Sequence, residues 1–143
     1  MIPSNPMPFD TYPHQVETDI RHSDTDRIGH VNNVAFAAFL EFGRASLLYN
    51  LTSRNPVPGH AFVIVRLEID YRAEMRWPGK VQIGVGVSRI GQSSFAAKQA
   101  MFNAGKLVAE ANAVLVLMNE STRKSAPLPG EIIAALEALR LPA

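Results

Sequence analysis

Apolar and polar residues alternate along most of this chain, and alternation with a period of two is typical of β-strands. The first alternating stretch runs from Gln15 to Arg21. Four longer stretches with the same period are also predicted to be strands, at residues 63–72, 81–88, 94–102 and 106–118. Asn103-Ala104-Gly105 joins the last two as a hairpin connection. The last strand is apolar on both parities, which predicts a central position that is covered on both faces.

Two segments follow a helical pattern instead. Val34 to Asn50 contains no proline and follows two asparagines that can cap a helix. Its apolar residues do not keep to one stripe, and a helix that is apolar almost all round is a buried helix. A short amphipathic helix, Ile132 to Leu139, follows Pro129-Gly130. The pattern therefore predicts an α+β fold in which an antiparallel sheet curls around the helix at 34–50. Since such a sheet leaves one face and its edges uncovered, we expect a homodimer.

Composition narrows the class of protein. A chain of 143 residues fits one domain, 1–143, which begins with a proline-rich arm at 1–11. Its 14 basic and 13 acidic residues give a formal charge of +1, and the basic residues are scattered, so we expect no nucleic-acid partner. The absence of cysteine excludes disulfides, thiolate metal sites and a cysteine nucleophile.

Neither a membrane span nor a targeting peptide is predicted. The longest uninterrupted apolar run, Val34 to Leu40, has seven residues, whereas a spanning helix needs roughly 18. No basic residue precedes an apolar run near the N-terminus, as a signal or transit peptide would require. We therefore expect a cytoplasmic protein with no membrane partner.

The densest polar cluster lies immediately before the predicted central helix. Residues 22–33 hold two carboxylates, two imidazoles and two amides. The N-terminus of a helix offers unpaired backbone N–H groups and a positive dipole end, which stabilise an oxyanion. A carboxylate beside such donors can act as a general base or a nucleophile on an ester-like carbonyl.

Each member of this cluster also has a structural interpretation. Asp24 and Asp26 can hydrogen-bond the local backbone in Asx-turns. Asn32 and Asn33 can serve as helix caps, and His30 can bond a loop carbonyl. Metal binding by Asp24, Asp26 and His30 is conceivable, but no second cluster supplies further ligands, so we predict no metal site.

The cluster closely resembles the signature of the hotdog-fold acyl-CoA thioesterases, the 4-hydroxybenzoyl-CoA thioesterase-like family. The motif residues are Asp24-Thr25-Asp26, Gly29-His30-Val31-Asn32-Asn33, Phe36, Phe39, Glu41 and Arg44. Later segments resemble the strands of that family: Ile69-Asp70-Tyr71-Arg72, Gly91-Gln92-Ser93-Ser94, Gly105-Lys106-Leu107-Val108-Ala109-Glu110 and Pro127-Leu128-Pro129. The resemblance extends from about Tyr12 to Pro129. In the hotdog fold an antiparallel sheet wraps around one long central helix.

The resemblance implies hydrolysis of an acyl-CoA thioester at the interface of a homodimer or homotetramer. Asp26 matches the family's catalytic carboxylate, as general base or nucleophile. The oxyanion donor falls on or near the backbone N–H of Asn33, and His30 and Asn32 would shape the pocket or orient water. Coenzyme A is part of the substrate, so no separate cofactor is expected.

Substrate contacts are predicted in two places. Glu41 matches a family residue that borders the substrate, although it can equally form an ion pair with Arg44, three residues along the helix. Three apolar residues are predicted to line the acyl pocket: Phe36, Val63 and Val65. The phosphates of coenzyme A require cations, and one turn offers Arg89, the N–H groups around Gly91, and the hydroxyls of Ser93 and Ser94. Arg123-Lys124 is a second surface candidate.

Two other functions stay open. A thioesterase acting on an acyl carrier protein would need a basic docking patch for its acidic partner, and the scattered basic residues do not form one in the sequence. A non-catalytic acyl-CoA-binding module would not need a carboxylate at Asp26.

Overall fold

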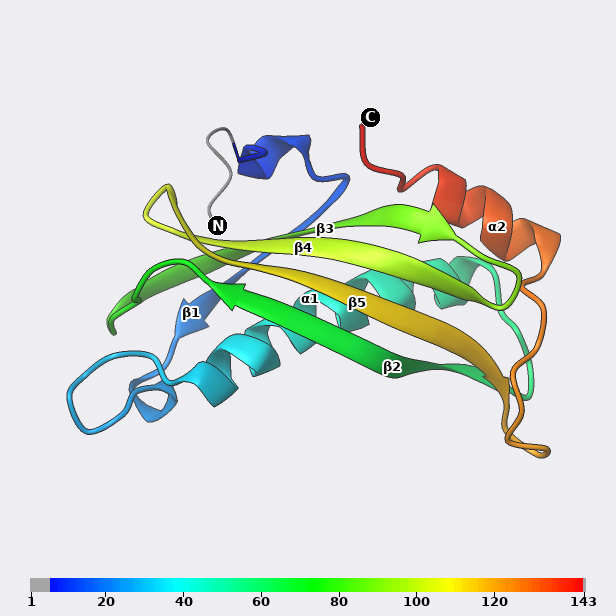
Figure 1. The fold of residues 1–143 in the computed structure, drawn as a ribbon, viewed down its shortest axis with the longest axis horizontal. Helices are drawn as coiled ribbons and strands as arrows, with labels where there is room; N and C mark the ends of the chain where they lie inside the picture. The colour runs from blue at the N-terminus through cyan, green and yellow to red at the C-terminus, as the bar shows by residue number, and fades with distance from the viewer. Residues whose placement is uncertain (1–5, 143) are drawn as a thin grey trace.

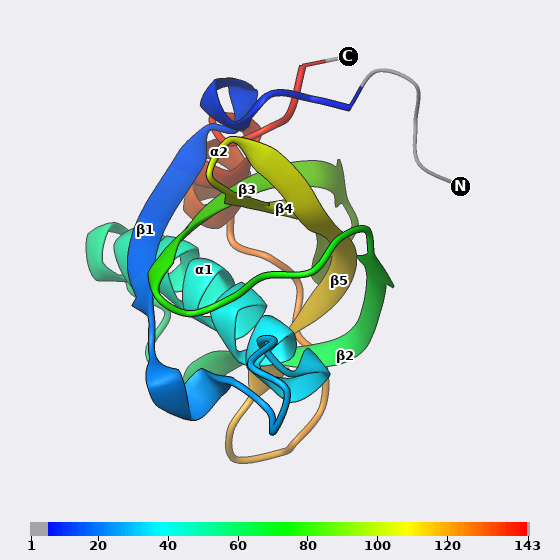
Figure 2. The same cartoon turned by 90° about the vertical axis from the view of Figure 1, so that its left-hand side faces the viewer.

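The computed structural model describes residues 6–142, and five residues of the predicted N-terminal arm, Met1–Asn5, lie outside the described residues. Five antiparallel strands form one sheet in the order β1-β3-β4-β5-β2, and this sheet curls around the helix α1 (Figures 1 and 2). The elements are η1 Phe9–Thr11, β1 His14–Ile20, η2 His22–Asp24, α1 Asn33–Arg54, β2 His60–Tyr71, β3 Gly79–Ile90, β4 Ser94–Asn103, β5 Lys106–Asn119 and α2 Gly130–Glu137. The predicted α+β hotdog architecture is confirmed, and β5 has the expected interior position. No helix within residues 6–142 is long and apolar enough to span a membrane.

The central helix packs against the sheet at a glycine. A Cβ on Gly43 would lie 2.8 Å from Cγ2 of Ile83 and 3.2 Å from Nε2 of Gln99, so only a residue without a side chain allows this approach. Arg44 follows directly and is only 7% exposed, although charged side chains are seldom buried. Gln99 explains this burial, since its Oε1 accepts a hydrogen bond from Arg44 Nη1 (3.1 Å) while its Nε2 donates to the carbonyl oxygen of Leu40 (2.9 Å). A buried polar group is tolerated when it is hydrogen-bonded in this way.

The helix is not buried all round as its pattern predicted. Val34 is 72% exposed and Phe42 is 45% exposed. Both lie on helix faces that the curled sheet of one chain does not cover. Large apolar side chains that are exposed together indicate a surface that contacts a partner.

The outer face of the sheet is partly covered by the two ends of the described chain. Tyr12 lies on β3, where a Cβ on Gly84 would be 2.5 Å from the tyrosine ring. Leu141 lies on the same strand, where a Cβ built on Gly86 would overlap its side chain. Burial, together with the nearby carboxylate of Glu110, raises the pKa of Tyr12 to about 12. The two glycines of β3 are therefore packing residues.

The strand β2 lies at one edge of the sheet and contains a β-bulge. Its pairing with β5 shifts register between Ile64 and Arg66, which leaves Val65 as the extra residue. An extra residue reverses the alternation of side chains along a strand. Val63 consequently pairs with Val116 on the outer face, opposite α1, whereas unbroken alternation predicted it on the same side as Val65. Ile64 and Val65 are 45% and 59% exposed at this edge.

Candidate active site

The polar cluster forms a tight loop between β1 and the start of α1. Thr25 pairs with Val31 across the loop, and the N–H of Asp26 donates to the carbonyl oxygen of His30 at 2.8 Å. The N–H of Val31 donates to the carbonyl oxygen of Met75 at 2.9 Å, which ties the loop to the connection between β2 and β3. Because Met75 is only 1% exposed, this anchor fixes the loop against the core.

The two aspartates of the loop have different environments. Asp24 is buried, and its carboxylate accepts hydrogen bonds from the backbone N–H of Arg21 at 2.7 Å and from Nη2 of the same residue at 2.9 Å. Burial acts to raise the pKa of Asp24, but the hydrogen bonds from Arg21 outweigh it and the net pKa is lowered. Asp24 is therefore held in a structural ion pair.

Asp26 is exposed and only partly engaged. Its Oδ1 accepts the backbone N–H groups of Ile28 (3.0 Å) and His30 (3.1 Å), as the Asx-turn interpretation predicted. Its Oδ2 makes no hydrogen bond to any residue within 6–142. The carboxylate is thus oriented through one oxygen and has the other available to a ligand.

The start of α1 presents unpaired donors. The side chain of Asn32 accepts the N–H of Ala35 at 2.8 Å, which makes it the N-cap. Its carbonyl oxygen accepts the N–H of Phe36 at 3.3 Å. The N–H groups of Asn33 and Val34 have no acceptor in the part of the chain that the structure describes. A cap combined with free N–H groups is the arrangement in which a helix N-terminus binds an anionic oxygen.

His30 faces a carboxylate from the connection between β2 and β3. Its Nε2 lies 3.1 Å from Oε2 of Glu74, and the imidazole is mostly buried while Glu74 is exposed. No group of three histidine, aspartate or glutamate side chains suited to a metal ion occurs within residues 6–142. The trio Asp24, Asp26 and His30 does not form such a group, since Asp24 is paired with Arg21.

One cavity of about 610 Å³ brings all four predicted catalytic residues together. Its lining includes five residues predicted from the sequence to belong to the site: Asp26, His30, Asn32, Asn33 and Phe36. The other wall was not predicted from the sequence and is formed by Tyr71, Arg72, Ala73 and Glu74. Tyr71 contacts the ring of Phe36 edge to face, and its hydroxyl donates to the carbonyl oxygen of Asn33 at 3.2 Å. This wall depends on long-range packing, for which the local sequence carries no signal.

A second groove of about 510 Å³ runs between α1 and the edge strand β2. It contains Glu41 and Val65 but not Val63, which lies on the opposite face of the sheet. Glu41 and Arg44 both line it, yet their charged groups are not within 4 Å of each other, so the predicted ion pair does not form within the chain. Burial lowers the pKa of Arg44, and the charge of Glu41 partly opposes this effect.

The predicted coenzyme A turn lies elsewhere. Arg89 lies near the end of β3, Gly91 and Ser93 lie in the connection between β3 and β4, and Ser94 begins β4. This connection is at the opposite end of the sheet from the loop that contains Asp26 (Figure 1). The N–H of Gly91 donates to the carbonyl oxygen of Ser94 at 2.7 Å, so it is not free for a phosphate, contrary to the prediction.

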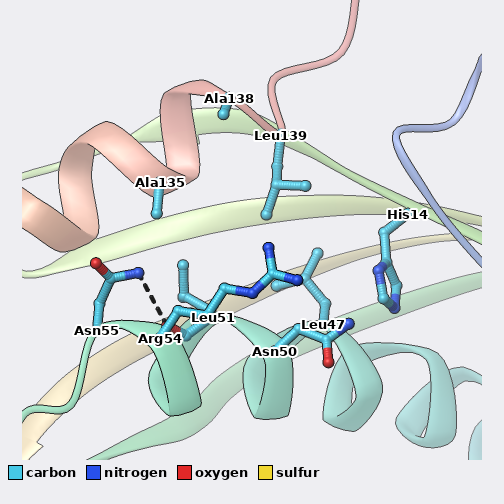
Figure 3. Close-up of a pocket in the computed structure, with 9 residues that line it drawn as sticks. All are labelled: His14, Leu47, Asn50, Leu51, Arg54, Asn55, Ala135, Ala138 and Leu139. Carbon is cyan, nitrogen blue, oxygen red and sulfur yellow. Dashed lines mark hydrogen bonds between the residues drawn. The ribbon is translucent and has the colours of Figure 1, made fainter.

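A smaller cavity of about 270 Å³ lies between α1, α2 and the start of β1 (Figure 3). Leu47 and Leu139 face each other across it, and Arg54 extends along it. Nε2 of His14 lies 2.9 Å from the hydroxyl of Ser46, and burial lowers the pKa of His14. None of the predicted site residues lines this cavity.

Comparisons with known proteins all identify thioesterases as the proteins to which this chain is similar. The family model of the thioesterase-like superfamily matches residues 20–136. The long-chain acyl-CoA thioesterase FadM of Escherichia coli is 29% identical over 127 residues, which cover 86% of this chain and 96% of that protein. A thioesterase of Thermus thermophilus, complexed with coenzyme A and Zn, is 32% identical with a TM-score of 0.79, covering 91% of this chain and 96% of its own. A predicted thioesterase of Bacillus stearothermophilus is 27% identical with a TM-score of 0.83, over 91% and 98% of the two chains.

Proposed function

This chain belongs to the thioesterase-like superfamily of thioester hydrolases, and from this premise we propose that it hydrolyses acyl-coenzyme A to a carboxylic acid and free coenzyme A. One observation carries the proposal. The exposed carboxylate of Asp26 borders the same cavity as Asn33, the first residue of α1, whose backbone N–H group is unpaired. A base and an oxyanion site are the two components that acyl transfer to water requires.

The reaction follows from these groups. Oδ2 of Asp26 takes a proton from a water molecule as the water oxygen adds to the thioester carbonyl carbon. The carbonyl oxygen becomes an oxyanion, which the N–H groups of Asn33 and Val34 stabilise. The intermediate then collapses, the C–S bond breaks, and the proton on Asp26 passes to the departing sulfur. Thioester carbonyls are activated enough that one carboxylate and fixed amide donors suffice without a serine or cysteine.

Asp26 has an alternative role as the nucleophile. Its Oδ2 would then attack the carbonyl carbon, release the thiol and form a mixed anhydride that water hydrolyses. Thiol release in a rapid burst before steady turnover indicates the anhydride, and release without a burst indicates the general base.

The neighbouring residues have supporting roles in this proposal. Asn32 caps α1 and thereby holds the two oxyanion donors in place. His30, beside Glu74, shapes the wall near the water, and Phe36 contacts the acyl group at the cavity floor. Glu41 and Val65 border the groove that continues along α1.

A homodimer completes the active site. The edge strand β2 has twelve residues and exposes Ile64 and Val65 beside exposed Val34 of α1. Exposed apolar edges of this length pair with another strand, and a two-fold axis joins two identical edges antiparallel. Light scattering should give a dimer or a tetramer built as a dimer of dimers, and Ile64→Lys should shift the mass to a monomer.

The decisive experiment measures thiol release from a panel of acyl-CoAs. Asp26→Asn should lower kcat/KM by about 10²- to 10⁴-fold, the usual contribution of a general base. Asp10→Asn is the matched control, since it removes an exposed carboxylate of η1 without touching the cavity. Full activity of Asp26→Asn would refute the assignment of this residue. Wild-type protein that binds acyl-CoA without releasing thiol would instead identify a binding module, and release only from acyl carrier protein would identify the other thioesterase class.

A further inference from the structure

A third groove opens from the active-site cavity on the side away from α1. Its volume is about 670 Å³, and it shares Arg72, Ala73 and Glu74 with the cavity that contains Asp26. Its remaining lining comes from the connection between β2 and β3, with Arg76 and Pro78, and from the hairpin of β4 and β5, where Asn103 ends β4, Ala104 lies in the turn and Lys106 begins β5. A ligand can therefore extend from one cavity into the other.

The backbone fixes the positions from which the two outer cations extend. Arg76 pairs with His30 in an isolated bridge, directly after the buried Met75. Lys106 follows a tight turn in which Ala104 and Gly105 have φ values of +50° and +79°. The side chain of Asn103 donates to the carbonyl oxygen of Lys80 at 2.8 Å and holds this turn against β3.

The charges of the groove are unbalanced. Nη2 of Arg72 lies 3.1 Å from Oε2 of Glu110, so its charge is compensated. The carboxylate of Glu74 lies beside His30. Arg76 and Lys106 form no ion pair with any residue in the described range 6–142, and both are exposed. Two uncompensated cations thus line a groove that leads into the catalytic cavity.

We infer that this groove binds the phosphate groups of coenzyme A through Arg76 and Lys106, an assignment that rests on the proposed function. Guanidinium and ammonium groups are the side chains that bind phosphates most strongly. The chain has a net charge of only +1, so recognition of a polyanionic substrate depends on local cations. The pantetheine arm would pass Ala73 and Glu74 and deliver the thioester to Asp26. By contrast, the turn at Arg89 borders neither the active-site cavity nor this groove.

Two substrates with the same acyl group distinguish phosphate binding from catalysis. Acyl-CoA carries the phosphates, and the N-acetylcysteamine thioester lacks them. We expect Arg76→Ala and Lys106→Ala each to raise KM for acyl-CoA about 3- to 10-fold, as the loss of one exposed charge-assisted contact does. The double variant should raise KM roughly 10- to 100-fold and weaken its dependence on salt. For the truncated thioester, KM and kcat should stay as in the wild type.

Arg89→Ala is the matched control and should leave both substrates unaffected. The inference is overturned if the double variant keeps the wild-type KM for acyl-CoA, or if Arg89→Ala raises KM instead. An equal rise for both substrates would also overturn it, since that would show damage to the catalytic cavity. A rise confined to acyl carrier protein substrates would assign the groove to an acidic protein and reject coenzyme A.

If the proposed hydrolase activity is wrong, the experiment gives a result that differs from failure of the phosphate site. If wild-type protein hydrolyses neither thioester, the activity is refuted, and calorimetric titration with coenzyme A alone still decides the groove. Weaker binding by the double variant than by wild type and Arg89→Ala would support the phosphate site, and equal binding by all three would reject it.

Discussion

Substitutions of Asn32, the N-cap of the central helix, can test separately how this residue affects helix stability and how it affects oxyanion binding. Oδ1 of Asn32 accepts the N–H of Ala35 at 2.8 Å, and the next two N–H groups are the proposed oxyanion donors. Asn32→Ala removes the cap, whereas Asn32→Asp keeps an acceptor in the same place and adds a negative charge. Asn32→Ser keeps a neutral acceptor and serves as the control.

The expected sizes of the two effects differ. Loss of an N-cap costs about 1 kcal/mol. With an unfolding entropy of about 2.1 cal/mol/K per residue, a chain of 143 residues should lose about 3 °C in Tm from Asn32→Ala. Asn32→Asp should keep or raise Tm, because aspartate caps equally well and the helix dipole favours a negative charge there.

The effect on kcat should be different, because the variant that keeps Tm, Asn32→Asp, is the one that should lower kcat. A carboxylate about 7 Å from a developing oxyanion raises its energy by roughly 2 kcal/mol at an effective dielectric constant of about 20. Asn32→Asp should therefore lower kcat roughly 30- to 50-fold, while Asn32→Ser stays within a few-fold of wild type.

Scanning calorimetry and thiol-release kinetics on the same samples provide the test. If Asn32→Asp kept the wild-type kcat, the oxyanion could not lie at the start of α1. If Asn32→Ala kept the wild-type Tm, the cap would not stabilise the helix.

Two further predictions concern stability. Gly84→Ala should lower the free energy of unfolding, measured by scanning calorimetry, by about 1 to 3 kcal/mol, since its Cβ would overlap the ring of Tyr12. Gly130→Ala is the control and should show no loss in the same scans, because a Cβ there meets nothing within 4 Å. Burial lowers the pKa of His14, so the unfolded chain binds a proton more readily and stability is lost as the pH falls below the ordinary histidine value. Between about pH 8 and pH 5.5, Tm should fall more for wild type than for His14→Gln, and equal losses would show that burial does not hold the His14 ring unprotonated.

The periodicity of apolar and polar residues was sufficient to predict the architecture, because it depends only on residues that are close together in the chain. Alternation in five stretches predicted the strands, and the continuous apolar segment after Asn33 predicted the helix that the sheet surrounds. The loop from His22 to Asn33 was also accessible, since Asp26 and the helix start are only a few residues apart in the chain.

Features that depend on distant packing could not be predicted. The bulge at Val65 interrupts a run of consecutive apolar residues, so the reversal that places Val63 outside leaves no mark in the sequence. Arg44 is buried because Gln99, 55 residues later, accepts its hydrogen bond. Glu74 and Arg76 reach the site because Met75 is tied to Val31, a contact that no local pattern encodes.

The bulge in β2 also bears on aggregation. A long exposed edge with apolar side chains is a template onto which unrelated strands can add. A bulged edge is bent and locally more twisted, so a flat strand cannot pair along its whole length. A second copy related by a two-fold axis brings an identical bulge and can match the distortion. Val65 thus favours pairing of this edge with a second copy of the chain over pairing with strands of unrelated chains that are misfolded or still being synthesised.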